Sequence, residues 1–317
     1  MSHQLPAVQT TDTAIAERLA YHRHAARGAY SPNTERALRA DSAVFAAWCV
    51  EHHVASMPAT PATVAAFVDA MADTRAPATV RRYVASIATM HRHAGVENAC
   101  AAEEVRLALK RMHHTHGTRQ RQAPALTRPL VDRMLAATGE RLIDARDRAI
   151  LAVAYDTLCR RTELVAFDVA DVLMADDGTA TVLVKRSKTD QDGAGMVRFL
   201  AVDTVRHLVA WLATAGHTAG RLFRSVTKSG LVGGGLDAGE VAAIFRKLAT
   251  RAGLTVRPSG HSTRVGAAQD MVAAGLELGE IMRAGGWRTP TMPARYSEHL
   301  AARRSASAKL AGLQNRL

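Results

Sequence analysis

A stretch near the C-terminal end of the sequence brings together residues that could act on a phosphate. His261 and Arg264 lie where a helix is predicted to begin, with apolar residues at helical spacing behind them. The first turn of a helix exposes backbone N–H groups and favours an anion, so both side chains could converge there on one phosphate. Trp287 adds an indole donor, and Tyr296 adds a phenol that could act as a nucleophile.

Each of these residues has an ordinary structural interpretation when it is taken alone. A histidine beside a helix start is usually a cap, an arginine in a first turn is usually solvated, and a C-terminal aromatic residue is usually packing. Two distant segments make the combination more specific. TLCRRTELVAF places Arg160 at the end of a predicted buried helix, with Glu163 one turn later as its partner. RSKTD places Lys188 in the connection of a predicted hairpin, where a lysine is usually only solvated.

With these segments included, the sequence resembles the tyrosine recombinases of the phage integrase family. The motifs that carry the resemblance are HSTRVGAAQDM, EIMRAGGW followed by a tyrosine, TLCRRTELVAF and RSKTD. It covers nearly the whole chain, from about Ser31 to the C-terminal helix. The resemblance implies that Tyr296 is the nucleophile and that the remaining catalytic roles fall on Arg160, Lys188, His261, Arg264 and Trp287, with Glu163 orienting Arg160.

The chemistry implied by the resemblance is site-specific recombination of DNA. The tyrosine would attack a phosphodiester and form a 3′-phosphotyrosine, and strands would be exchanged through a Holliday junction in a synaptic tetramer. The two arginines would hold the non-bridging oxygens, and Trp287 would donate to the same phosphate. His261 would assist proton transfer at the tyrosine, and Lys188 would act as general acid. The phosphotyrosine keeps the bond energy, so no metal, ATP or other cofactor is expected.

Charge and composition agree with a nucleic-acid partner. The formal net charge is +12, from 41 basic and 29 acidic residues, which is typical of a protein that binds a polyanion. The resemblance makes the partner double-stranded DNA with an inverted-repeat site, bound by a homotetramer that is a monomer or weak dimer when free. A membrane is not expected, because there is no long apolar run and no signal peptide. Three scattered cysteines fit reduced thiols in a cytoplasmic, nucleoid-associated protein.

Helical periodicity predicts a mostly α protein with a small antiparallel β element (α+β). Residues 1–28 are weakly patterned and are expected to form a flexible arm or a marginal helix. Residues 29–114 predict an all-helical DNA-binding domain, which the resemblance makes a SAM-like core-binding domain. Residues 115–126 predict a basic linker, and 127–300 a mainly helical catalytic domain with a hairpin formed by 179–186 and 196–202. Residues 301–317 predict a C-terminal helix that packs on its own domain or, by resemblance, docks onto a neighbouring protomer.

Six basic residues are the candidates for DNA contact: Arg81, Arg82, Lys228, Arg246, Lys247 and Arg251. The first two lie on an outward helix face, where a solvated surface is the alternative. The third lies in a loop where close relatives place a DNA-contacting lysine. The last three lie on the helix that the resemblance places in the major groove. Gly239 stands where close relatives carry their main base-reading arginine, so a different DNA target is expected.

Three other classes of protein compete with the recombinase. If the chain were a DNA-binding protein without activity, suitable residues at all six catalytic positions would be a coincidence. A metal-dependent nuclease needs clustered carboxylates, and the nearest group is expected to be solvated in loops: Asp168, Asp171, Asp176 and Asp177. A type IB topoisomerase shares the tyrosine chemistry, but the helical N-terminal domain and the C-terminal helix favour the recombinase.

Overall fold

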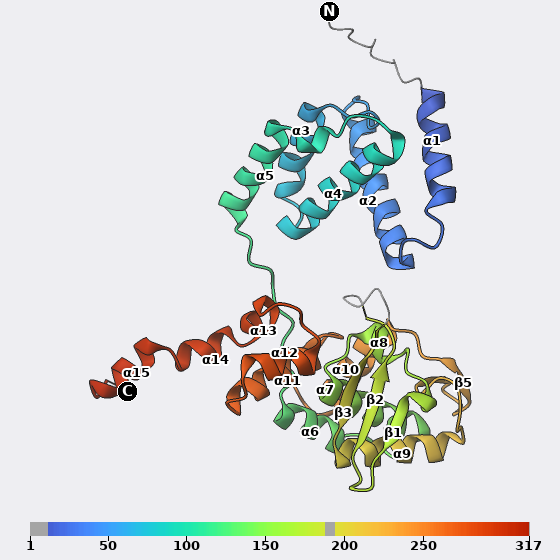
Figure 1. Cartoon of the computed structure of the whole chain (residues 1–317), viewed down its shortest axis with the longest axis vertical. Helices are drawn as coiled ribbons and strands as arrows, with labels where there is room; N and C mark the ends of the chain where they lie inside the picture. The colour runs from blue at the N-terminus through green and yellow to red at the C-terminus, as the bar shows by residue number, and fades with distance from the viewer. Residues whose placement is uncertain (1–11, 188–193, 317) are drawn as a thin grey trace, which may run out of the picture. The chain divides into compact units, whose positions relative to one another are not determined.

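In the computed structural model the chain divides into two units between Arg121 and Gln122 (Figure 1). The structure describes residues 12–187 and 194–316. The division falls inside the segment predicted to be a linker. Residues 117–126 of this segment form no helix or strand. The expected fold class, mostly α with a small antiparallel β element, is confirmed.

All regular elements described in the first unit are helices. They are α1 (Asp12–Ala25), α2 (Pro32–Glu51), α3 (Pro61–Ala72), α4 (Pro77–Ala94), the 3₁₀ helix η1 (Ala99–Ala101) and α5 (Glu103–His116). The start of α2 follows from Ser31, whose hydroxyl accepts from the backbone N–H of Thr34, and α3 starts in the same way at Thr60. Proline at the first position of both helices has no N–H to leave unpaired. Phe67 lies at the centre of the core, edge-to-face with Phe45 and Trp48.

Helix α1 lies in the stretch 1–28, for which a flexible arm or a marginal helix was expected. It packs on α4, with Ile15 buried and the Arg18 guanidinium donating to the carbonyl of Gly95 at 3.2 Å. The His22 ring stacks on His93, with ring centroids 3.9 Å apart. The sequence signal is weak because one short apolar face cannot specify a helix by itself. Tertiary contacts supply the missing stability.

The second unit places a small sheet and a hairpin among helices. Before the sheet lie α6 (Arg128–Ala136), α7 (Leu142–Thr157), α8 (Arg161–Leu164) and the 3₁₀ helix η2 (Val169–Asp171). The strands are β1 (Val172–Met174), β2 (Ala180–Val184), β3 (Met196–Leu200), β4 (Arg224–Val226) and β5 (Val232–Gly235), with α9 (Val202–Ala215) between β3 and β4. Five helices follow: α10 (Glu240–Arg251), α11 (Ser262–Ala273), α12 (Leu278–Gly285), α13 (Thr291–Tyr296) and α14 (Glu298–Arg303), and then α15 (Ala306–Leu313) ends the fold.

The predicted hairpin is confirmed as the antiparallel pair β2–β3, in which Val182 faces Arg198. On the inner face of β2, Ala180, Val182 and Val184 are buried, as the alternation of the sequence requires. Strand β1 pairs with β2 on the other side and was not predicted, because three residues are too few for a period to show. Strands β4 and β5 form a separate antiparallel ribbon.

Helix α7 lies in the middle of the core of the second unit. It contacts α6, α9, α10, α11 and β3, and Ile150, Leu151 and Val153 are fully buried. At its end Leu158 takes a left-handed conformation, with φ +51°, and turns the chain into Arg160. The most buried helix of the unit thereby fixes the position of the first arginine of the candidate site.

The predicted C-terminal helix is present as α15, and no residue of α14 or α15 is buried. Leu310 is 50% exposed and Leu313 is 84% exposed, so the short apolar face of α15 is left uncovered. Among residues 12–187 and 194–316, no helix has both the length and the apolar composition to cross a membrane.

Candidate active site

Helix α11 positions the histidine and the second arginine of the site. It begins at Ser262, whose hydroxyl accepts from the backbone N–H of Ser259 at 2.9 Å and closes the turn that carries His261. Its first turns are buried against the segment before α6. A Cβ added at Gly266 would lie 1.9 Å from the carbonyl oxygen of Leu126, so only glycine allows this approach.

The side chain of Arg264 is buried, with 2% of the residue exposed. Its Nη1 donates to the carbonyl of Leu158, while its Nη2 has no hydrogen-bond partner among the described residues. Burial, and then the positive charge of Arg160, lower the pKa of Arg264 to about 10, so it stays protonated at neutral pH. A buried cation with an unused N–H group is costly unless an anion binds it. The site is therefore suited to a phosphate.

Arg160 precedes the short helix α8 and is held by Glu163, as the sequence suggested. The Arg160 Nη1 donates to Glu163 Oε1 at 2.7 Å, and the Arg160 backbone N–H donates to Oε2 at 2.8 Å. Glu163 is buried, whereas the Arg160 side chain keeps 21% of its surface exposed. The carboxylate thus fixes the guanidinium while leaving part of it open to a ligand.

His261 lies directly before α11 and keeps an exposed surface. Loss of water around the ring, and then the positive charges of Arg264 and Arg160, lower the pKa of His261. The imidazole is therefore neutral at pH 7 and able to accept a proton.

Trp287 and Tyr296 complete the group on the other side of Arg264. The Arg264 guanidinium carbon lies 4.2 Å from the centroid of the Trp287 ring. The rings of Trp287 and Tyr296 meet edge to face, with centroids 5.9 Å apart. Gly286 makes the turn after α12 with φ +63° and so brings the indole back over the helix end. Five of the predicted catalytic positions, from four separate segments, thus lie together in the second unit.

The sixth predicted catalytic residue, Lys188, lies outside the described residues. Lys185, at the end of β2, pairs instead with Asp171 at 2.7 Å and with Asp168 at 3.0 Å. Asp171 is buried and caps the turn at Asp168, so the expectation of solvation in loops is wrong for these two carboxylates, whereas Asp176 and Asp177 are exposed as expected. Within the described ranges no three His, Cys, Asp or Glu side chains gather as a metal site would require.

Arg198 belongs to the surroundings of the site and was not found from the sequence. It is buried on β3, and its Nη1 donates to the carbonyls of Arg283, at 2.6 Å, and of Ala284. These carbonyls end α12, so the cation caps the helix that leads into Trp287. An arginine in an alternating strand pattern gives no sign in the sequence that it points inward.

The basic residues predicted to contact DNA lie in different surroundings. Arg81 and Lys228 are exposed, the latter in the turn between β4 and β5. Arg82 pairs with the buried Asp41 at 2.9 Å, and Arg246 is partly buried on α10. Arg81 and Lys228 therefore stay the freest of these candidates in the described parts of the chain.

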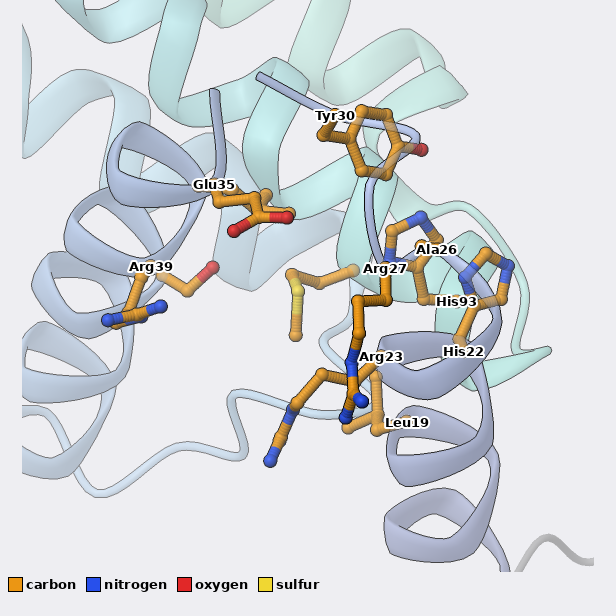
Figure 2. A pocket seen from close by; sticks show the side chains of 12 residues that line it. Leu19, His22, Arg23, Ala26, Arg27, Tyr30, Glu35, Arg39 and His93 are labelled. Atoms are coloured by element: carbon orange, nitrogen blue, oxygen red, sulfur yellow. The ribbon is translucent and has the colours of Figure 1, made fainter. Parts of the chain in front are cut away.

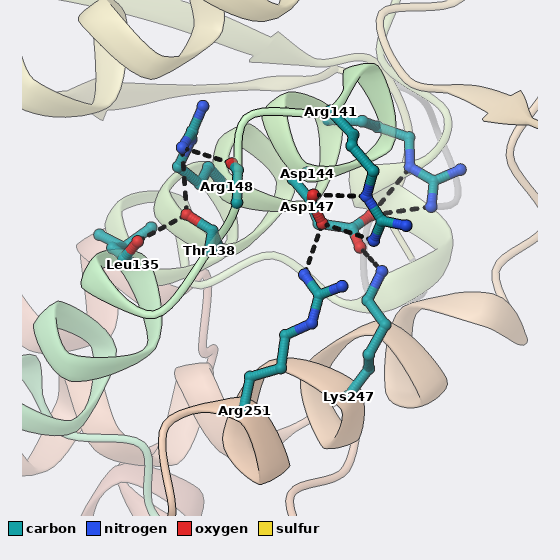
Figure 3. A network of polar contacts seen from close by, with 10 residues as sticks. Leu135, Thr138, Arg141, Asp144, Asp147, Arg148, Lys247 and Arg251 are labelled. Carbon is teal, nitrogen blue, oxygen red and sulfur yellow. Dashed lines mark hydrogen bonds and ion pairs between the residues drawn. The ribbon is translucent and has the colours of Figure 1, made fainter. Parts of the chain in front are cut away.

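Two further candidates, Lys247 and Arg251, join α10 to α7 through buried carboxylates (Figure 3). Lys247 pairs with Asp147, and Arg251 pairs with Asp144. Burial disfavours the charge of Asp144, but hydrogen bonds from Arg141 and Arg251 outweigh it and lower its pKa to about 2. These ion pairs give both cations a structural role. Their contact with DNA stays a prediction.

A separate pocket of about 640 Å³ lies in the first unit, between α1, α2 and α4. Arg23 comes from α1, Arg27 from the turn after it and Arg39 from α2, and all three lie around the pocket together with the stacked His22 and His93 (Figure 2). The sequence did not reveal this pocket, because its walls come from helices whose pairing is tertiary.

Comparisons with known proteins show which family the chain is similar to. The model of the phage integrase family matches residues 124–303. Recombinase cre of Escherichia phage P1 is 28% identical to the chain over 313 residues, covering 90% of this chain and 89% of that protein. The integrase/recombinase xerD homolog of Selenomonas ruminantium is 31% identical over 278 residues, covering 84% of this chain and 81% of that protein.

Several solved structures share the fold of this chain. The crystal structure of a lambda integrase dimer bound to a COC′ core site matches with a TM-score of 0.62 at 16% identity, covering 91% of this chain and 95% of that one. A lambda integrase tetramer bound to a Holliday junction matches with a TM-score of 0.62 at 15% identity, covering 93% and 81%. Fold, site and relatives together define a site-specific recombinase. The chain belongs to the phage integrase family.

Proposed function

We propose that the protein cleaves and rejoins DNA strands with Tyr296 as nucleophile and a 3′-phosphotyrosine as intermediate. The observation that carries this proposal is the buried Arg264, whose Nη2 has no partner among the described residues and whose guanidinium packs on the ring that meets Tyr296. The other tyrosine of the region, Tyr155, is a poor candidate. Burial and its hydrogen bond to Asp270 raise its pKa, which keeps its phenol protonated.

In the cleavage step the Tyr296 oxygen forms a bond to phosphorus, and the bond from phosphorus to the 5′-oxygen breaks. Arg160 and Arg264 bind the non-bridging oxygens, where charge builds in the transition state. Trp287 donates its indole N–H to the same phosphate. These groups are held before DNA arrives, Arg160 by Glu163 and Arg264 by the carbonyl of Leu158. Little reorganisation is then needed during the reaction.

Two protons move in this step. The neutral His261 takes up the phenol proton, directly or through water, and Lys188 supplies a proton to the departing 5′-oxygen. A 5′-hydroxyl from a partner strand then attacks the phosphotyrosine and reverses the step. Because the phosphotyrosine conserves the bond energy, the reaction needs neither a metal ion nor ATP.

We further propose that the protein acts on duplex DNA with an inverted-repeat site, as a homotetramer that forms on DNA and passes through a Holliday junction. The lambda integrase structures, a dimer on a core site and a tetramer on a Holliday junction, support this assembly. The uncovered Leu310 and Leu313 of α15 support docking of this helix onto a neighbouring protomer. The net charge of +12 supports a place at the nucleoid, with the first unit as a second DNA-binding body.

Capture of covalent adducts tests the proposal. Wild type and Tyr296→Phe are expressed in cells, which are lysed in detergent with EDTA, and DNA attached to protein is sequenced. We expect adducts from wild type at one recurring inverted-repeat site, and none from Tyr296→Phe, although this variant still binds that duplex. Tyr155→Phe is the matched control and should form adducts. An adduct on Tyr296→Phe, or wild-type adducts that form only when EDTA is left out, would contradict the assignment.

A further inference from the structure

The backbone carbonyl of Tyr296 accepts hydrogen bonds from two glutamine side chains. The Nε2 of Gln269 donates to it at 2.8 Å, and the Nε2 of Gln122 donates at 3.4 Å. Tyr296 is the last residue of α13, so its carbonyl has no partner within that helix. The helix stops there because Ser297 leaves the helical conformation, with φ −103° and ψ 10°. The two amides thus satisfy an acceptor that the helix end leaves open.

The stronger of the two donors lies on the helix that binds the phosphate. Gln269 is on α11, which also carries Arg264 and follows directly on His261. The start of α11 is fixed by its close contact with Leu126 at Gly266. One rigid helix therefore sets the position of the phosphate at one end and of the nucleophile's backbone further along. This arrangement suits an in-line attack, where a displacement of about 1 Å can cost a factor of about 100 in rate.

The weaker donor comes from the segment that enters the second unit. Gln122 is the first residue of that unit. The chain that follows is bonded along α11, through Leu126 N–H to the carbonyl of Ser262 at 2.9 Å and through Arg128 N–H to Asp270 Oδ2 at 2.6 Å. Gln122 thus reaches Tyr296 from a segment that is itself attached to the same helix.

We propose that Gln269 is a positioning residue for the nucleophile and that Gln122 supports it. The inference rests on the proposed role of Tyr296. Gln269 touches neither the phosphate nor the phenol in this scheme. It holds the main chain of Tyr296, so that the phenol is presented to a phosphate held by Arg264.

Three side chains at position 269 test the hydrogen bond separately from packing. The amide of wild type donates at every pH, and Gln269→Met keeps a similar volume but never donates. Gln269→Glu cannot donate when ionised, but its carboxyl regains an O–H donor when protonated. The probe is the duplex recovered with the wild-type adducts, and the readouts are single-turnover cleavage, DNA affinity and thermal unfolding.

At neutral pH we expect both variants to cleave about ten-fold more slowly than wild type, the usual weight of one hydrogen bond, with unchanged DNA affinity. As the pH is lowered towards about 5, the ratio of the wild-type rate to the Gln269→Glu rate should shrink. The ratio for Gln269→Met should stay constant. Gln122→Met should slow cleavage by about three-fold or less, because its bond is longer.

The outcomes separate this inference from the proposed function. Adducts from wild type, together with wild-type rates in both Gln269 variants, would overturn the positioning role alone. So would equal losses in the Met and Glu variants at every pH, since the O–H donor that protonated Glu regains would then make no difference. Absence of adducts from wild type would overturn the proposed function itself. Should Gln269→Met fail to fold, the pH dependence of Gln269→Glu still decides the question.

Discussion

The guanidinium of Arg264 packs on the Trp287 ring with its central carbon 4.2 Å from the ring centroid, and the same ring meets Tyr296 edge to face. One indole therefore connects the buried Arg264, which we propose binds the phosphate, to Tyr296, the proposed nucleophile. Its face stabilises a guanidinium that has lost its water, and its N–H, which has no hydrogen-bond partner among the described residues, is proposed to donate to the phosphate. Trp287 is thus expected to act through its ring face and through its N–H, and substitutions can separate these two properties.

Trp287→Phe should lower the cleavage rate about ten-fold, because it keeps a ring face for Arg264 and loses the N–H donor. Trp287→Ala should lower it about 100-fold or more, because Arg264 then also loses its packing. Single-turnover cleavage of the target duplex measures both. Equal rates in the two variants would show that the packing of the ring on Arg264 contributes nothing.

Glu163→Gln should lower cleavage about ten-fold and also reduce the melting temperature, because it leaves Arg160 without its buried counter-charge. The matched control is Glu103→Gln, which breaks an exposed ion pair with Arg106 at the same i, i+3 spacing. That pair is worth only about 0.5 kcal/mol or less, so no change is expected. A fall in stability without a fall in cleavage would restrict Glu163 to a structural role.

Asp144 should make the second unit sensitive to acid. Its folded-state pKa of about 2 lies below the ordinary value of 3.8, so its ion pairs stabilise the fold above pH 4. This contribution, about 2 kcal/mol, is lost as the pH falls from about 4 to about 2. Asp144→Asn should remove it, as measured by urea unfolding at pH 7 and pH 3. The exposed Asp176→Asn should leave the pH dependence unchanged.

His261 should set the acid limb of the cleavage rate. Its pKa is lowered below the ordinary value of 6.5, so the neutral, proton-accepting form persists to a pH below 6.5. The rate should rise with pH through this lowered pKa and be level by neutral pH. His261→Asn should flatten this limb and lower the plateau about 100-fold. A limb that survives in His261→Asn would belong to another group.

Much of the architecture could be predicted from short-range signals. Ser31 and Thr60 with the prolines after them mark the starts of α2 and α3, and the alternation of β2 marks its buried face. The weak pattern of α1 left a flexible arm and a marginal helix both open, and β1 was too short to be predicted. Such elements are stable only through their neighbours. In α9, Val209 is 48% exposed, whereas Trp211 is fully buried and donates its indole N–H to the carbonyl of Leu222.

By itself the sequence determined which chemistry is present. The motif formed by His261, Arg264, Trp287 and Tyr296 can be recognised from the sequence, because it depends only on residue types and their spacing. Only the tertiary structure shows which basic side chains form ion pairs within the fold. Lys247 and Arg251 pair with carboxylates of α7. The tertiary structure alone revealed the hydrogen bond of Gln269 to the backbone carbonyl of Tyr296. Partners distant along the chain leave no local pattern, since burial and pairing are properties of the folded chain.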